Sequence, residues 1–317
     1  MSDQCKHCTG RGDIHKCRKI KDCSIKESWF AIEAIEVIQE LAKQLKEAQA
    51  DAQYSFLIPF PKHYPHSPLR YPGGKNRAVK PICQCIPANE KVLCSPFFGG
   101  ASVELACSTR MEVRGYDAFG PLVDFWNVLL SDPNRLADAV TRYYPLSRTK
   151  FYNLQKIYMN LENQMDRAAA FYVLNRSSFS GTTLSGGMSP NHPRFTLSSI
   201  QRLRDFDVSN FNVKKADFTE SIAKNADAFL YLDPPYLNGQ TLYGLKGDTH
   251  KGFDHKTLAD MLSKRGRWIL SYNDCKTIRE YYKDYQILDI DWTYGMSKSK
   301  ISNEVLVVSH DLEAVAS

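Results

Sequence analysis

The sequence lacks any apolar run long enough to cross a membrane. No segment of its 317 residues approaches the roughly 20 consecutive apolar residues that a membrane-spanning helix needs. The first residues, among them Cys5 and Cys8, also lack the apolar core of a signal peptide. We therefore expect a cytoplasmic protein that does not associate with membranes.

Strong charge of either sign is missing as well. The 41 Lys and Arg against 35 Asp and Glu leave a formal net charge of +6, which permits a polyanionic partner without demonstrating one. The glycine turns have neither the G-x-G-x-x-G spacing of dinucleotide sites nor the pattern of a phosphate-binding P-loop. The length fits one large α/β core plus a smaller module.

Nine cysteines are an odd number, which argues for free thiols or metal ligands over a disulfide framework. Cys5, Cys8, Cys17 and Cys23 lie close together among turn-forming glycines. Four thiolates could hold one tetrahedral zinc ion, whose binding energy would fold a segment too small to have a core. We predict a zinc-binding module over residues 1–26, with surface thiols on a tail as the alternative.

An amphipathic helix is predicted from about residue 24 to residue 53. Ile35, Ile38 and Leu41 belong to a series of apolar residues at three- and four-residue spacing. This stripe would pack on the zinc module, on the main domain, or on a second copy of itself in a homodimer. Prolines then break regular structure, so residues 27–67 form this helix and a linker.

The apolar run Leu230-Tyr231-Leu232 stops at Asp233-Pro234-Pro235-Tyr236. The run has the length of a buried strand, and neither proline could donate to a sheet, so the chain leaves the sheet at Asp233. A carboxylate, a backbone carbonyl and an aromatic ring thus stand at the carboxyl end of a strand. Open α/β sheets bind ligands there, although an ordinary strand and rigid turn would read the same.

Two glycine turns lie upstream of this strand. In residues 69–75 two glycines let the backbone approach a ligand, and the lysine after them can meet an anionic group. Residues 91–94 predict a first strand, and the following turn at 97–100 leads into a helix, as in loops that pass under a nucleoside-like cofactor. A second predicted strand ends in Asp117, which is well placed for the two hydroxyls of a ribose.

Five motifs in this order resemble those of Dam-type, alpha-group DNA adenine methyltransferases, over about residues 68–311. They are Tyr71-Pro72-Gly73-Gly74-Lys75, Phe97-Phe98-Gly99-Gly100, Asp117, Asp217-Phe218 and Asp233-Pro234-Pro235-Tyr236. The resemblance implies an α/β, Rossmann-like methyltransferase fold. It also implies transfer of a methyl group from S-adenosylmethionine to adenine in double-stranded DNA, in the cytoplasm of a bacterium or of a phage or viral host.

The resemblance also assigns cofactor contacts. It implies Tyr71 and Lys75 near the methionine part, Phe98, Gly99 and Gly100 under the cofactor, Asp117 at the ribose, Asp217 and Phe218 at the adenine, and Asp233 beside the methyl group. One departure is Ser95, where the family usually has an acid before Pro-Phe. A cofactor contact is therefore either lost or supplied elsewhere.

The exocyclic nitrogen of adenine is a poor nucleophile because its lone pair is delocalised into the ring. If the Asp233 carboxylate and the Pro234 carbonyl each accept one of its hydrogens, the lone pair turns toward the methyl donor. Tyr236 would stack on the base, which must be rotated out of the duplex to be reached. These three residues are the predicted catalytic group, and the step needs no metal.

The segment between Asp117 and Asp217 has apolar residues mostly at helical spacing. Residues 182–195 are rich in Gly, Ser, Asn and Pro, which predicts an exposed hairpin or loop. The resemblance makes residues 124–200 the target-recognition domain, between catalytic segments 68–123 and 201–317. The candidates for DNA contacts are Arg176, Ser189, Asn191, His192 and Arg194, with Lys298 and Lys300 between two predicted C-terminal strands, and each is equally consistent with a solvated side chain.

Two alternative functions fit the same motifs. A methyltransferase of this fold could act on the cytosine amino group, an RNA base or a protein amide, although Asp233 favours adenine. A DNA-binding regulator of another class could retain the cofactor fold without turnover. The sequence does not indicate which DNA word is recognised.

Overall fold

The structure is a computed structural model that describes residues 37–41, 60–71, 73–189, 194–237, 252–290 and 304–309. The chain divides into two compact units, Met1–Phe56 and Leu57–Ser317. In the first unit residues 37–41 are helical, as expected, and the rest of the predicted helix lies outside the described residues. In the described part of the chain, no helix is long and apolar enough to span a membrane.

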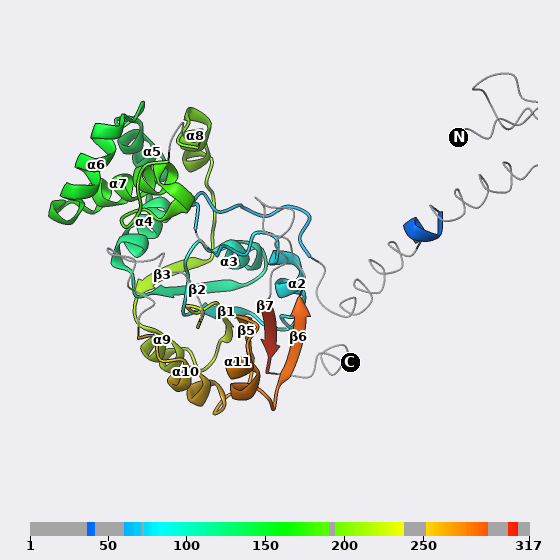
Figure 1. Cartoon of the computed structure of the whole chain (residues 1–317). Helices are drawn as coiled ribbons and strands as arrows, with labels where there is room; N and C mark the ends of the chain where they lie inside the picture. Colours follow the sequence, from blue (N-terminus) through cyan, green and yellow to red (C-terminus); the bar gives the residue numbers. More distant parts are fainter. Residues whose placement is uncertain are drawn as a thin grey trace, which may run out of the picture. The chain divides into compact units, whose positions relative to one another are not determined.

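The second unit is built on a seven-stranded sheet with the order β3-β2-β1-β4-β5-β7-β6 (Figure 1). The parallel strands are β1 (Val92–Ser95), β2 (Glu112–Asp117), β3 (Phe211–Lys215), β4 (Phe229–Leu232) and β5 (Trp268–Asn273), and β7 (Glu304–Val308) pairs antiparallel with both β5 and β6 (Gln286–Ile290). The strand order reverses between β1 and β4. The carboxyl ends of these two strands therefore form the topological switch point, where ligands bind in such sheets.

Helices cover both faces of this sheet (Figure 1). They are α2 (Val79–Gln84), α3 (Ser102–Cys107), α9 (Phe218–Lys224), α10 (His255–Leu262) and α11 (Lys276–Tyr281). Ile222, Leu258 and Ile278, one from each of α9 to α11, are buried in one apolar cluster with Leu230 and Leu270 of the central strands. Because both faces are covered, β4 is apolar and buried along its whole length. The predicted Rossmann-like α/β fold is confirmed.

A helical unit is inserted between β2 and β3, as the sequence predicted (Figure 1). Its helices are α4 (Gly120–Ser131), α5 (Pro133–Thr141), α6 (Arg148–Ile157), α7 (Gln164–Ser177) and α8 (Leu197–Arg204). Helix α7 is buried from Ala168 to Asn175 because α4, α5 and α6 pack around it. Helix α8 was not predicted, since it is short and its Thr196 capping box uses Ser199 in place of the usual Glu or Gln.

The expected exposed loop after α7 is wrong at Thr183 and Leu184, which are buried. The amide of Gln155 donates to the backbone oxygens of both residues, at 3.0 Å each. Asn175 donates to Gly181 O and to the Thr183 hydroxyl. Side-chain amides thus satisfy the backbone of this segment and draw it inward.

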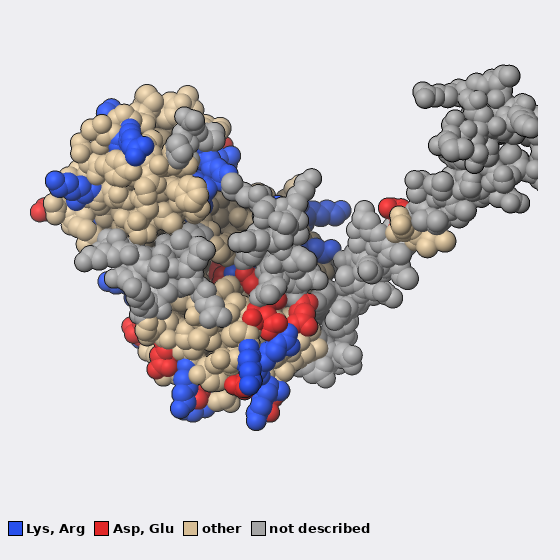
Figure 2. Space-filling model, in the orientation of Figure 1, with Lys and Arg blue, Asp and Glu red and all other residues tan. Residues whose placement is uncertain are grey.

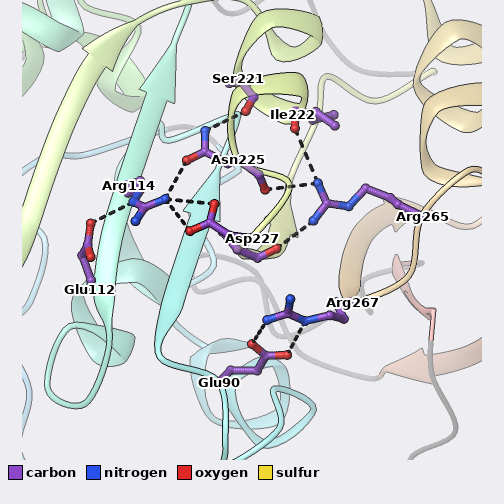
Figure 3. A network of polar contacts seen from close by, with 10 residues as sticks. Glu90, Glu112, Arg114, Ser221, Ile222, Asn225, Asp227, Arg265 and Arg267 are labelled. Atoms are coloured by element: carbon purple, nitrogen blue, oxygen red, sulfur yellow. Dashed lines mark hydrogen bonds and ion pairs between the residues drawn. The ribbon is translucent and has the colours of Figure 1, made fainter.

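Ion pairs join neighbouring strands at the amino edge of the sheet (Figure 3). Arg114 of β2 pairs with Asp227, which precedes β4. Arg267, just before β5, forms two hydrogen bonds with the buried Glu90, just before β1. Arg265 donates to backbone oxygens after α9. This network lies at the opposite ends of the strands from the switch point, so we assign it to stability and not to chemistry.

Candidate active site

The structure places Asp233, Pro234 and Tyr236 directly after β4, at the switch point. All four residues of β4 are buried, and the strand ends where the two prolines can no longer donate hydrogen bonds. The carboxylate, carbonyl and ring expected at this strand end are therefore present at the edge of the sheet where ligands bind.

The Asp233 carboxylate is held by Lys75. Lys75 Nζ lies 2.8 Å from both Asp233 oxygens and donates to Gly73 O at 3.0 Å. The Lys75 side chain is 4% exposed and that of Asp233 is 22% exposed, so the pair is shielded without being sealed. Tyr236 OH donates to Asp233 Oδ1 at 3.3 Å, and Lys75 Nζ lies 5.1 Å from the centroid of the Tyr236 ring. One ammonium thus orients both the carboxylate and the aromatic ring.

Two further buried carboxylates lie near this ion pair. Glu304 Oε2 is 3.8 Å from Lys75 Nζ. Glu104 of α3 accepts a hydrogen bond from the Ser95 hydroxyl at 2.6 Å. Burial raises the pKa of Glu104 to about 7, and the Asp233 carboxylate adds to the rise while Lys75 opposes it. With all three carboxylates ionised, this group has an excess of negative charge.

Glu104 also explains the departure at Ser95. The family usually has an acid at that position, and here the serine instead donates to an acid on the next helix. Both side chains are buried. A carboxylate is therefore present beside the end of β1, although it comes from α3 and the sequence alone did not identify it.

The glycine turn after β1 lies against Tyr71. Gly99 has φ +47°, and a Cβ built on it would lie 3.0 Å from Cε1 of Tyr71. At Gly100 a Cβ would lie 2.8 Å from the Tyr71 Cβ. The Phe98 ring is buried beneath the turn, where it meets Trp126 edge to face. Only glycines allow the turn and Tyr71 to approach this closely.

Asp117 ends β2 beside this turn. Its carboxylate accepts hydrogen bonds from Gly99 N at 3.1 Å and from Phe119 N at 2.9 Å. Burial raises the pKa of Asp117 to about 6, although these two amide hydrogen bonds oppose the rise. An acceptor of this kind suits a ligand that brings hydroxyl donors, such as a ribose.

Asp217 and Phe218 lie at the start of α9. Asp217 Oδ1 accepts from the Thr219 hydroxyl at 2.6 Å and from Glu220 N at 2.9 Å, and the Thr219 bond contributes most to its lowered pKa. The side chain is thus a helix cap. Phe218 stacks on Phe97 with centroids 5.8 Å apart, and Phe253 lies 5.1 Å from Phe218. These three rings form an aromatic group beside the switch point.

Sequence reasoning missed two residues that support Tyr236. The Tyr236 ring stacks on Tyr272 of β5, with centroids 5.6 Å apart. The Tyr272 hydroxyl donates to Pro235 O at 3.3 Å and also forms a hydrogen bond with Nδ1 of His255. Burial lowers the pKa of His255, which favours its neutral form at pH 7. The available signal was the pairing of β5 with β4, which no local motif shows.

Of the predicted DNA contacts, the structure describes Arg176, Ser189 and Arg194. Arg176, in the last turn of α7, donates to Arg194 O at 3.0 Å and to Pro68 O at 3.4 Å. Ser189 N donates to Ser177 O at 3.0 Å. The remaining candidates, Asn191, His192, Lys298 and Lys300, lie outside the described residues, as do the predicted zinc ligands Cys5, Cys8, Cys17 and Cys23.

The sequence matches a protein-family model described as D12 class N6 adenine-specific DNA methyltransferase over residues 71–296. This span is well over half of the chain and contains every site residue described above except Glu304. The chain belongs to this family. It is therefore an adenine-specific DNA methyltransferase, as the motifs predicted, and the family favours adenine in DNA over the alternative acceptors and the non-catalytic regulator.

Curated relatives are similar over most of their own length. A DNA adenine methylase of Vibrio cholerae is 25% identical over 239 residues, which cover 69% of this chain and 85% of the relative. A type II methyltransferase of Lactococcus lactis subsp. cremoris is 22% identical over 269 residues, covering 76% and 94%. A DNA N-6-adenine-methyltransferase of Escherichia phage P1 is 25% identical over 245 residues, but these cover only 31% of that protein.

The methyltransferase family implies S-adenosylmethionine as the methyl donor and DNA as the substrate. Nothing in the described part of the methyltransferase offers a metal site, since no three His, Cys, Asp or Glu side chains come together suitably there.

Proposed function

We propose that Asp233, Pro234 and Tyr236 methylate the exocyclic amino group of an adenine that has been rotated out of the DNA duplex. The observation that supports this most is the Asp233 carboxylate, fixed by Lys75 at the end of β4 and flanked by the Tyr236 ring. A carboxylate in a fixed orientation and a ring beside it are what an adenine amino group and an adenine base require.

The proposed step depends on positioning. Each carboxylate oxygen has two acceptor directions, so Asp233 can bind Lys75 and still accept one hydrogen of the amino group. The carbonyl of Pro234 accepts the other hydrogen. The nitrogen lone pair is then freed from the ring and directed toward the methyl group. Preorganised acceptors of this kind lower the barrier because they need not reorient during the reaction.

The described residues fit the methyl donor. S-adenosylmethionine supplies a methyl group on a positively charged sulfur, and the carboxylates of Asp233, Glu104 and Glu304 give the site the opposite charge. Asp117 can accept from ribose hydroxyls, and Phe218 offers a ring for a purine. We propose Tyr71, Lys75, Phe98, Gly99, Gly100, Asp117, Asp217, Phe218 and Asp233 as the residues that hold the donor.

Access to the adenine requires its removal from the base stack, which costs a few kcal/mol. Stacking of the base on Tyr236 would offset about 1 to 3 kcal/mol of this cost. We propose that residues 124–200 recognise the target word. Phe179 supports this proposal: it is 65% exposed and adjoins Ser180 at φ +52°, on a turn that offers an aromatic ring to a base stack.

We further propose zinc binding by Cys5, Cys8, Cys17 and Cys23, in support of which stands their spacing alone. Association of two copies through the 24–53 helix is a second proposal, supported by its apolar stripe, and location in the cytoplasm is a third. Metal analysis of the full-length protein tests the first, and the absence of zinc after mild purification would contradict it.

Methyl transfer to duplex DNA tests the main proposal. The wild-type protein is incubated with labelled S-adenosylmethionine and DNA of random sequence. We expect label in the DNA, loss of label with Asp233→Ala, and retention of most label with Tyr236→Phe, which keeps the ring. Label transfer that survives in Asp233→Ala would contradict the assigned role of this carboxylate.

A further inference from the structure

Four arginines gather where residues 68–70 meet the ends of α7 and α8. Arg70 Nη1 donates to Ser178 O at 3.2 Å, and Arg176 donates to the backbone oxygens of Pro68 and Arg194. The fourth is Arg202 of α8, whose charge acts on Arg176. Figure 2 shows Lys and Arg side chains on the helical unit beside the position of α8, while Asp and Glu side chains gather mainly over the sheet below.

The positions of these arginines are fixed by the fold. The backbone of Arg70 is bound to Asn175 of α7 in both directions, since Arg70 N donates to Asn175 Oδ1 at 2.8 Å and Asn175 Nδ2 donates to Arg70 O at 2.9 Å. Asn175 is completely buried. The segment before Tyr71 is therefore attached to the helical unit at Arg70.

No carboxylate neutralises this group in the part of the chain that the structure describes. The guanidiniums of Arg70 and Arg176 meet only backbone oxygens there, and Arg202 forms no ion pair with a described residue. Burial lowers the pKa of Arg70 to about 10, and the charges of Arg194 and Arg176 lower it further. Like charges held together in partly buried positions are costly, and an anion would relieve this cost.

Other arginines of the same unit have carboxylate partners. Arg204, two residues from Arg202 on α8, pairs with Asp138 at 2.7 Å. Arg167 pairs with Asp124 at 2.8 Å. The lack of a carboxylate is thus particular to the group around Arg70 and not general to the helical unit.

The unused donors match a phosphate group. A guanidinium has five N–H donors, and Arg70 uses one of them within the described structure. Its planar fork binds oxyanions through paired hydrogen bonds. Arg70 also lies five residues before Lys75, a span of at most about 18 Å of extended chain. Successive phosphates of one DNA strand are about 3.4 Å apart, so this distance reaches the phosphates that flank the adenine bound at Asp233.

We propose that Arg70, Arg176, Arg194 and Arg202 form one site for the DNA backbone phosphates that flank the flipped adenine. The proposal rests on the proposed function, because the phosphates are placed relative to the adenine at Asp233. Arg70 and Arg202 are new assignments, found only because the fold brings isolated basic residues together. The site holds the DNA in register and does not read its sequence.

The test compares Arg70→Gln and Arg202→Gln with Arg204→Gln, a matched control on α8 whose positive charge is already paired with Asp138. Full-length proteins are titrated with labelled duplexes of several sequences over a series of salt concentrations. We expect Arg70→Gln and Arg202→Gln to weaken binding about tenfold for every sequence. The slope of log K against log salt should fall by about one in each. Arg204→Gln should match the wild type.

Binding of S-adenosylmethionine, measured separately, should stay at the wild-type value in all three variants, which shows that the site around Asp233 is intact. Equal DNA affinity and salt slope in Arg202→Gln, Arg70→Gln and Arg204→Gln would overturn the proposal, as would a loss confined to one DNA sequence. A failure of the proposed function would show differently, as wild-type protein that binds DNA with the expected salt slopes yet methylates none.

Discussion

At the scale of single residues, the site is organised by Lys75. Its ammonium touches both oxygens of Asp233, lies 3.8 Å from Glu304 Oε2 and faces the ring of Tyr236. The glycine turn that carries it was visible in the sequence, but its partner was not. The lysine was expected near the methionine part of the cofactor, and the structure adds a direct contact with the carboxylate that accepts the amino hydrogen.

Replacement of this lysine should therefore impair the chemical step. Lys75→Met removes the charge that orients Asp233 and leaves a buried carboxylate without its main partner. We expect the single-turnover rate of methyl transfer to fall about 100-fold or more. Lys276→Met is the control, since Lys276 is 91% exposed on α11 and pairs only with Glu280 in the described structure. An unchanged rate in Lys75→Met would show that Asp233 needs no such support.

Glu104 makes a prediction about stability and pH. Its pKa is raised by burial to about 7, so the folded state favours the protonated form, and the wild type loses stability as the pH rises from about 4.5 through 7. Glu104→Gln resembles the protonated form and should escape this loss. Urea unfolding at pH 5 and pH 8 measures the effect: the variant should gain stability relative to the wild type at pH 8. The exposed Glu112→Gln is the control, and an equal difference at both pH values would contradict the account.

At the scale of elements, the turn after β1 is shaped by the contact of two glycines with Tyr71. A methyl group at Gly100 would lie 2.8 Å from the Tyr71 Cβ, which is too close for both to keep their places. Gly100→Ala should therefore displace the tyrosine and weaken S-adenosylmethionine binding at least about tenfold, with the protein still folded. Gly266→Ala is the control, because nothing lies within 4 Å of a Cβ there. Equal affinities in an equilibrium binding assay would show that the turn does not shape the cofactor site.

The amino edge of the sheet should respond in the opposite way. Glu90 is buried, and its partner Arg267 precedes β5, so Glu90→Gln weakens a contact between strand ends far from the switch point. We expect a loss of about 1 to 3 kcal/mol in the free energy of unfolding, measured in urea. The methylation rate of the folded protein should remain at the wild-type value. A large loss of rate with stability intact would mean that this network serves catalysis.

At the scale of the whole molecule, local patterns were sufficient for the strands and for most helices. Strand β4 was predictable because an apolar run stops at two prolines, and α4 to α7 because their apolar residues recur at helical spacing. Other features depend on tertiary pairing. Tyr272 reaches Pro235 because β5 lies beside β4, and Glu104 reaches Ser95 because α3 folds back on the end of β1. No local motif encodes these approaches, and for the same reason Arg70 and Arg202 did not stand out.

The identity of the modified base tests the central claim most directly. Wild-type protein and Asp233→Ala are each incubated with duplex DNA of random sequence and S-adenosylmethionine, and the DNA is digested to nucleosides for mass spectrometry. The account predicts N6-methyladenine with the wild type, within one short DNA word, and none with Asp233→Ala. Methylated cytosine, or N6-methyladenine formed equally well by Asp233→Ala, would contradict it.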